Sequence, residues 1–434
     1  MRLRRGALAE RLRASLFLVP TLAVAAAVVI AAVAIGIDSE LDPSGADLPL
    51  GFTSTVESAR ALLGTIAGAT ITFAGIAFSV SLLIIQQASS QYSPRVVHTL
   101  FRDPFNRRVM GLVVGTFTYC LLILRSVRTS LELGGDPVIP NLSVAIAVVL
   151  GIVTILAIVA FIDHSAHAMD ISNILQDVEE QAIAQIRREW TDADPEAQRP
   201  SPSRPTDTTN TVRFERSGWI DQLDVDKLAR CVPAGEVMWV DAYPGRYAVA
   251  GTSVCSLSTA PDDPEAVTRE VLASIGTGDT RTMQQDVSFG VRQLADVALK
   301  ALSPGINDPT TAQDAIFHSA AVLAELLRRN PPAPPEPPDD CGQLVLVHQP
   351  THEDLIRLAF DEVRQAAAPM PTVCIYLLEA LELLIEVAAD GPPGRRDALR
   401  LQAELVVAGC AAANNLPADL RDVEHAFHER FGSR

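Results

Sequence analysis

Four long apolar stretches in the first 162 residues constrain the fold more than any other feature of the sequence. They cover residues 16–37, 62–85, 109–124 and 142–162. A helix crosses a bilayer core with about 20 apolar residues, and the first, second and fourth stretches reach that length. The third is shorter, but the flanking Arg107, Arg108 and Arg125 can extend to the two interfaces. The sequence therefore predicts a four-helix transmembrane domain over residues 1–162, followed by a large soluble tail.

The distribution of arginine predicts the orientation in the membrane, because Lys and Arg accumulate in loops that stay in the cytoplasm. Arginines gather before the first stretch and between the second and third, at Arg2, Arg4, Arg5, Arg11, Arg13, Arg95, Arg102, Arg107 and Arg108. The opposite loops hold fewer, namely Arg60, Arg125 and Arg128. We therefore expect a multi-pass membrane protein with both termini in the cytoplasm. The basic start also resembles a cleavable signal peptide, although its apolar run is long for one.

Composition and motifs exclude several function classes. The formal net charge of −17 makes nucleic acid an unlikely partner, since phosphate binding depends on clustered Lys and Arg. All six cysteines are isolated, without a CxxC pair or a histidine at zinc-ligand spacing. The sequence contains no Walker loop and no GxGxxG, HExxH or GxSxG motif. We therefore predict neither an enzyme activity nor a cofactor.

The second apolar stretch carries a row of small residues. Gly64, Gly68, Thr72, Gly75 and Ser79 follow one another at steps of four, four, three and four, which places them on one face of a helix. Small faces allow close helix packing, so one interpretation is a packing ridge within the protomer or between subunits. The other is a pore or substrate path lined by hydroxyl groups. No charged residue lies between Leu62 and Ile85, so a cation site made by charged side chains is not expected there.

Polar residues gather where the fourth stretch ends. Asp163, His164, His167 and Asp170 lie within two helical turns. Imidazole and carboxylate groups can bind a divalent cation or relay protons near neutral pH. The alternative is a set of ordinary polar groups at the membrane interface, and a single helix rarely supplies a complete metal shell. Both interpretations stay open.

The tail divides into segments of different composition, which predict an α+β region that is mainly helical with a small β-rich module. In order they are a juxtamembrane amphipathic helix over 163–190, a linker over 191–211, the β-rich module over 212–258, a helical domain over 259–330, a proline-rich linker over 331–342 and a mostly helical region over 343–434. Within the module, residues 247–254 are predicted as one strand. Asp263 and Pro264 begin a helix that Gly276 is expected to end.

Two stretches of the chain resemble a known family. One is 70–95, the second apolar stretch and its exit, followed by Phe101, Arg102 and Asp103; the other is 285–312, QDVSFGVRQLADVALKALSPGINDPTTA. Both are similar to a widespread bacterial family of predicted membrane proteins, domain-of-unknown-function family 2254. The resemblance implies four N-terminal spans and a cytosolic tail, and it implies no activity. It also draws attention to a polar cluster that could bind a small ligand or simply fix a turn: Asp286, Arg292, Asp296, Asn307 and Asp308.

Three classes of function are consistent with this sequence. The leading hypothesis is a homo-oligomeric channel or transport-like protein whose cytosolic domain regulates or assembles it. Small-conductance mechanosensitive channels have a loosely similar plan, and this likeness is an analogy of fold only. The alternative is a membrane-anchored scaffold or sensor that presents a cytosolic interaction domain. An enzyme is the third. The partners expected are the lipid bilayer and further copies of the chain, with any small ligand or ion unknown.

Overall fold

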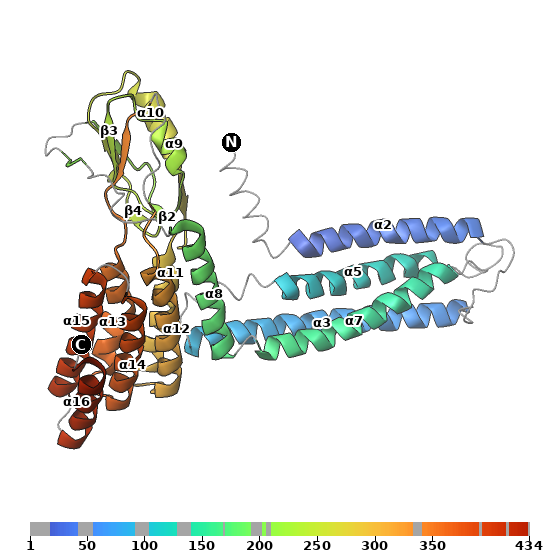
Figure 1. Ribbon diagram of the computed structural model, residues 1–434. Coiled ribbons are helices and arrows are strands. Elements are labelled where there is room, and N and C mark those ends of the chain that lie inside the picture. The colour runs from blue at the N-terminus through green and yellow to red at the C-terminus, as the bar shows by residue number, and fades with distance from the viewer. Residues whose placement is uncertain are drawn as a thin grey trace. The chain divides into compact units, whose positions relative to one another are not determined.

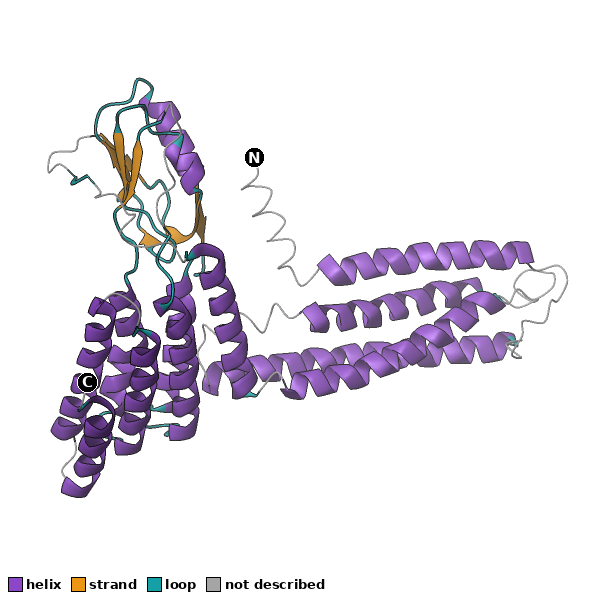
Figure 2. Ribbon diagram, in the orientation of Figure 1, coloured by secondary structure: helices purple, strands orange, loops and turns teal. Residues whose placement is uncertain are grey.

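The computed structural model describes residues 18–41, 55–91, 104–127, 140–167, 170–191, 202–204, 210–332, 341–389, 393–413 and 416–432. They form two compact units, an N-terminal unit up to Asp170 and a C-terminal unit from Ile171 onward. Figure 2 shows that the described part of the N-terminal unit is helical and that the strands belong to the C-terminal unit.

Four helices make up the described N-terminal unit (Figure 1): α2 (Leu18–Leu41), α3 (Val56–Gln91), α5 (Pro104–Ser126) and α7 (Asn141–His167). Each contains a segment long and apolar enough to cross a membrane, of 22, 28, 22 and 25 residues respectively. The prediction of four N-terminal membrane helices is therefore confirmed, including the third, whose helix extends beyond its short apolar stretch. Many large apolar side chains on these helices are exposed, such as Leu83, Ile155 and Leu156, as expected for surfaces that face lipid.

A close approach between α2 and α5 depends on two glycines of α5. A Cβ atom added at Gly111 would lie 3.2 Å from Val19, and one at Gly115 would lie 3.3 Å from the Ala23 carbonyl oxygen. Small residues four apart let two membrane helices pack backbone to backbone. The sequence analysis did not single out this pair of glycines, although its spacing is the one expected for helix packing.

Helix α8 (Ile171–Glu189) opens the C-terminal unit and packs on α11 (Val287–Ala301) and α12 (Pro309–Leu327). Its buried residues recur every three or four positions, at Ile174, Leu175, Val178, Ala182, Gln185 and Ile186. The stripe lies in the amphipathic helix predicted over 163–190, and helices of the same unit cover it. The contact is close at Gly290, where an added Cβ atom would lie 2.8 Å from the Ala182 side chain.

Two small sheets form the β-rich module. The first has the order β1 (Asn210–Arg213), β5 (Ser253–Leu257), β3 (Val237–Val240) and β7 (Gln343–Leu346), and the second has the order β4 (Tyr247–Ala248), β2 (Gly218–Leu223) and β6 (Ile275–Gly278). Strand β7 pairs in parallel with β3. The module therefore includes chain beyond residues 212–258, because β6 and β7 complete its sheets. Two short helices, α9 (Val225–Ala229) and α10 (Pro264–Leu272), pack beside them.

Two local expectations in the module differ from the structure. Residues 247–254 do not form one strand, since a turn at Gly251, with φ of +86°, separates β4 from β5, and these two strands belong to different sheets. Asp263 does cap a helix, and its side chain accepts from the Ala266 N–H. That helix ends at Leu272, however, and Gly276 lies opposite Gln222 in the ladder between β2 and β6.

The remaining helices pack side by side with α11 and α12 (Figure 1). They are α13 (His352–Ala367), α14 (Pro371–Val387), α15 (Pro393–Ala413) and α16 (Pro417–Phe431). Capping chemistry sets their starts: Thr351 and Asp354 form a capping box before α13, and prolines stand in the first turn of α14 and α16. The prediction of a mainly helical region with a small sheet module is confirmed.

Most of the two predicted linkers, 191–211 and 331–342, lies outside the described residues. A short described piece of the first, residues 202–204, is attached to the module. The Pro202 carbonyl accepts from the Trp239 indole N–H at 3.0 Å, and Arg204 forms an ion pair with Asp241 at 2.8 Å. This part of the predicted linker therefore contacts strand β3 and the loop that follows it.

Candidate functional site

The row of small residues on α3 lies on the outside of the described N-terminal unit. Gly64, Gly68, Thr72, Gly75 and Ser79 are all exposed, and Cβ atoms added at the three glycines would meet no atom within 4 Å. The two hydroxyl groups donate to their own helix, Thr72 to the Gly68 carbonyl at 2.8 Å and Ser79 to the Gly75 carbonyl at 3.0 Å. Among the described residues this face packs on no other helix of the N-terminal unit. Contact between subunits and a role in a pore stay predictions.

The polar residues at the end of α7 are only partly described. His164 lies with its ring 4.7 Å from the Phe105 ring, a contact that orients the imidazole beside α5. The His167 side chain is outside the described residues, and residues 168 and 169 separate α7 from Asp170. Within the described part of the chain, no group of three His, Cys, Asp or Glu side chains could hold a metal ion. The proton or metal site at these positions stays a prediction.

The polar cluster suggested by the family resemblance is spread along α11. Asp286 precedes the first residue of this 15-residue helix and Asp308 follows its last turn, so about 22 Å of helix separates them. Midway, Arg292 binds Asp296 at 2.7 Å and Glu362 at 2.5 Å, which joins α11 to α13. The five residues therefore do not form one cluster. They lie at three separate places: the start of α11, its middle, and the turn that follows it.

Asn307 and Asp308 form the turn between α11 and α12. Asn307 has a φ of +50°, in the left-handed region that asparagine tolerates better than most residues. The Asp308 carboxylate accepts from the Thr310 and Thr311 N–H groups at 3.2 and 3.1 Å and from the Thr311 hydroxyl at 2.6 Å. The hydrogen bonds from Thr311, first of all that of its hydroxyl, lower the pKa of Asp308. This end of the polar cluster has the geometry of a helix cap.

Asp286, at the other end of α11, lies beside a cavity. Its carboxylate forms a two-point ion pair with Arg281, with distances of 2.5 Å to Nε and 3.2 Å to Nη2, and accepts from the Ser288 hydroxyl. It packs against the backbone of Gly245, where a side chain would collide with it and where φ is +86°. Asp286 is only 4% exposed, so Arg281 supplies the positive charge that its burial requires.

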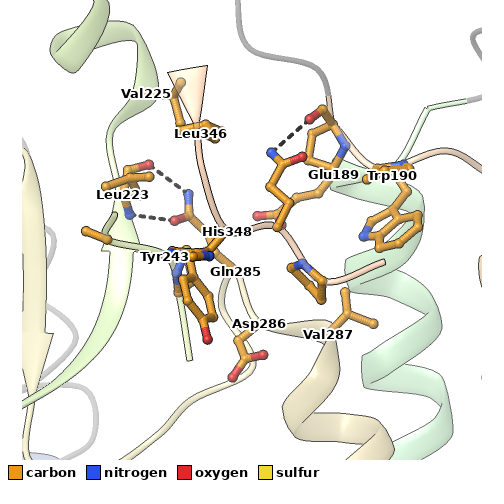
Figure 3. A pocket seen from close by; sticks show the side chains of 16 residues that line it. Glu189, Trp190, Leu223, Val225, Tyr243, Gln285, Asp286, Val287, Leu346 and His348 are labelled. Atoms are coloured by element: carbon orange, nitrogen blue, oxygen red, sulfur yellow. Dashed lines mark hydrogen bonds between the residues drawn. The ribbon is translucent and has the colours of Figure 1, made fainter. Parts of the chain in front are cut away.

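The cavity has a volume of about 260 Å³ and lies within the C-terminal unit (Figure 3). Several elements line it: the end of α8 with Glu189 and Trp190, the module with Tyr243, and the chain after β7 with His348. Gln285 also lines the cavity and is bound to strand β2 by two hydrogen bonds. Its side-chain oxygen accepts from the Leu223 N–H at 2.7 Å, and its amide donates to the Leu223 carbonyl at 3.4 Å. The cavity is therefore a meeting point of the β-rich module and the helices.

Glu189 is the unusual ionisable group of this cavity. Burial raises the pKa of its carboxyl to about 7, and the negative charge of Asp286 acts in the same direction, while a hydrogen bond from Gln185 and the charge of Arg188 oppose the shift. Next to it, Trp190 is 6% exposed and its ring meets the His352 ring edge to face, with 5.2 Å between centres. A carboxyl group that titrates near neutral pH in a cavity is a common mark of a functional site.

No sequence pattern predicts the cavity, although some of its residues belong to predicted features. Trp190 lies in the amphipathic helix predicted over 163–190, and Asp286 belongs to the predicted polar cluster. Glu189, Tyr243 and His348 carry no local signal, since they are far apart in the sequence. The parallel pairing of β3 with β7 brings the chain on either side of the proline-rich segment together, and no motif predicts that pairing.

The four spans and the tail that holds this cavity match one family model. The model for "Predicted membrane protein (DUF2254)" covers residues 13–383. The chain belongs to this family. Its relatives include the uncharacterized protein Rv1290c of Mycobacterium tuberculosis (strain ATCC 25618 / H37Rv) and the uncharacterized protein Mb1321c of Mycobacterium bovis. Each is 32% identical over 367 residues, which cover 82% of this chain and 69% of the relative. No solved structure matches the chain.

Proposed function

We propose that the protein is a membrane-anchored sensor that binds a small ligand in the cavity of its C-terminal unit. The observation that carries this proposal is the position of Glu189 and Trp190. Both line the cavity, and they lie at the end of α8, which follows the fourth membrane helix with only residues 168–170 between. A ligand in the cavity would therefore contact the soluble helix nearest in sequence to the membrane. The proposal includes no catalytic step.

The contacts of α8 support a role in relaying ligand binding. Besides its apolar stripe, α8 has two polar links to α12: Glu179 with His318 at 2.5 Å and Arg187 with Glu325 at 3.0 Å. Glu325 also binds Arg329 at 3.0 Å. A helix held by packing and ion pairs moves together with its neighbours. A ligand that displaces the last turn of α8 at the cavity would therefore also displace its first turn, which follows the fourth membrane helix in the sequence.

We further propose that the C-terminal unit lies in the cytoplasm and that the chain resides in the inner membrane of a bacterial cell. The surplus of arginine before the first span and between the second and third supports this orientation. A reporter enzyme that is active only in the cytoplasm, fused after Arg434, tests it in intact cells. An inactive reporter on a fully expressed fusion would contradict the orientation.

A pair of matched variants tests the sensor. Val225 and Val267 are both half-buried valines that pack on the core of the module, but only Val225 lines the cavity. Full-length protein in detergent is screened against a library of small soluble metabolites by thermal shift. We expect a binding compound to stabilise the wild type and Val267→Phe but not Val225→Phe, whose larger side chain fills the cavity. If no compound stabilises the wild type, or if Val225→Phe responds equally, the cavity is not the ligand site of a sensor.

A second candidate function is the homo-oligomeric channel or transport-like protein. The exposed face of Gly64, Gly68, Thr72, Gly75 and Ser79 favours it, because small faces usually meet another helix in membranes. The test is ion flux through liposomes that hold oriented, folded protein, across steps of voltage and osmotic pressure. Absence of flux under every condition would count against a channel and leave the sensor unaffected.

A further inference from the structure

The charged side chains that line the cavity are all acidic. Two carboxylates, Glu189 and Asp286, line it, and among its described lining residues there is no Lys or Arg. The charge of Asp286 is already compensated by Arg281. The Glu189 carboxylate has no ion-pair partner among the described residues, and its hydrogen-bond partner is the side chain of Gln185. A half-buried carboxylate that forms no ion pair is costly, and Arg188, whose positive charge acts on it, does not line the cavity. A positive group on a ligand would therefore be favoured here and a negative group repelled.

The rest of the wall is apolar or aromatic. Leu223, Val287 and Leu346 line the cavity together with several prolines. Trp190 lies next in the chain to Glu189, and a cation beside an indole ring is attracted by the electrons of its face. Tyr243 lines the cavity from the module (Figure 3), and the Arg246 guanidinium is 5.9 Å from its ring centre. The volume of about 260 Å³ is below that of most sites for drug-sized molecules.

From these features we propose that the cavity binds a small organic cation with an apolar body, with the Glu189 carboxylate as the counter-charge of its ammonium group and Trp190 beside it. The inference rests on the proposed function, because it names the ligand class of the same cavity. The apolar body lies against the leucine, valine and proline side chains, which exclude water from the ion pair and so strengthen it.

The ionisation of Glu189 gives the inference a second, independent readout. With a pKa of about 7 in the empty cavity, the carboxyl group is mostly neutral at pH 6 and must lose its proton to pair with a cation. Binding of an amine that stays protonated should therefore weaken about tenfold between pH 8 and pH 6. The groups that face Glu189 are Arg188 and Gln185 on α8 and Asp286 on α11, and His348 lines the same cavity.

The experiment uses three probes of one shape on the full-length protein in detergent. They are 2-phenylethylammonium, the neutral 2-phenylethanol and the anionic phenylacetate. Ligand-observed NMR measures the affinity of each probe at pH 6 and at pH 8. Val225→Phe serves as the blank for uptake into micelles. At pH 8 we expect the cation to bind about tenfold more tightly than the alcohol, as one ion pair of moderate strength would give, and phenylacetate to bind least.

Charge-neutralising variants locate the effect. Glu189→Gln should abolish both the preference for the cation and most of its pH dependence. Glu180→Gln, an exposed position on the same helix, should retain both. Thermal unfolding checks that each variant is folded, and the order of the three probes on the wild type does not depend on any variant.

The outcomes separate this inference from the proposed function. If the alcohol or phenylacetate binds as tightly as the cation and Val225→Phe removes that binding, the ligand class is wrong while the cavity remains a ligand site. If none of the three probes binds the wild type, the ligand class is again overturned, and the metabolite screen then decides whether the cavity is a sensor site at all. Equal binding of the cation to Glu189→Gln and wild type would exclude Glu189 as its counter-charge.

Discussion

Asp38, near the end of the first membrane helix, caps the start of the fourth at Ser143. Its Oδ2 accepts from the Ser143 N–H at 2.9 Å and from the Ser143 hydroxyl at 2.6 Å, and its Oδ1 accepts from the Leu142 N–H at 3.0 Å. The first N–H groups of a helix lack partners within it, and here another helix supplies them. The Tyr119 hydroxyl donates to the Ser143 carbonyl at 3.0 Å, so α5 joins the same junction.

Removal of this cap should loosen the junction of the three helices. We expect Asp38→Ala to lower the free energy of unfolding by about 1–2 kcal/mol, the usual effect of a lost N-terminal cap. Asp38→Asn keeps one oxygen acceptor and should lose less. Thermal unfolding in detergent measures both. If the alanine variant is as stable as the wild type, the carboxylate is not an effective cap.

The glycine contact between α2 and α5 makes a prediction about packing. Gly115 has the Ala23 backbone 3.3 Å from the position of an added Cβ atom, so a larger side chain must push the helices apart. Gly115→Leu should therefore destabilise the unit by about 1–3 kcal/mol, as overpacking of a close contact does. Gly36→Leu on α2, where nothing lies within 4 Å, is the matched control. Equal unfolding temperatures for the two variants would contradict this packing.

The exposed face of α3 makes the opposite prediction. Gly68 has no atom within 4 Å of an added Cβ, so Gly68→Leu should leave the protomer as stable as the wild type. If a second copy packs on this face, the same substitution should reduce the oligomer in detergent to smaller species. Mass measured by light scattering after gel filtration, with Gly36→Leu as control, reports the change. An unaltered oligomer would mean that subunits do not meet at Gly68.

The features predicted correctly from the sequence are those that depend on local pattern. Apolar length predicted the four spans, and Asp263 with Pro264 predicted the start of α10. The amphipathic helix predicted over 163–190 includes α8. The features that were missed depend on distant contacts. Arg292 and Asp296 were predicted only as members of a polar cluster, whereas in the structure Arg292 binds both Asp296 and Glu362, and Glu362 is 70 residues further along the chain. The cavity was missed for the same reason.

Glu189 makes a prediction about stability against pH that does not depend on any ligand. Burial raises its pKa to about 7, above the usual value of about 4.3 for an unfolded chain. The folded protein therefore holds this proton more tightly than the unfolded one, and Glu189 contributes less to stability as the pH rises from about 4.3 to about 7. Glu189→Gln stays neutral, so its unfolding temperature should exceed that of the wild type at pH 8 and match it at pH 4.5. Glu180→Gln, exposed on the same helix, should show no such difference. A gain for Glu189→Gln that is the same at both pH values would mean that the carboxyl group is not held neutral by burial.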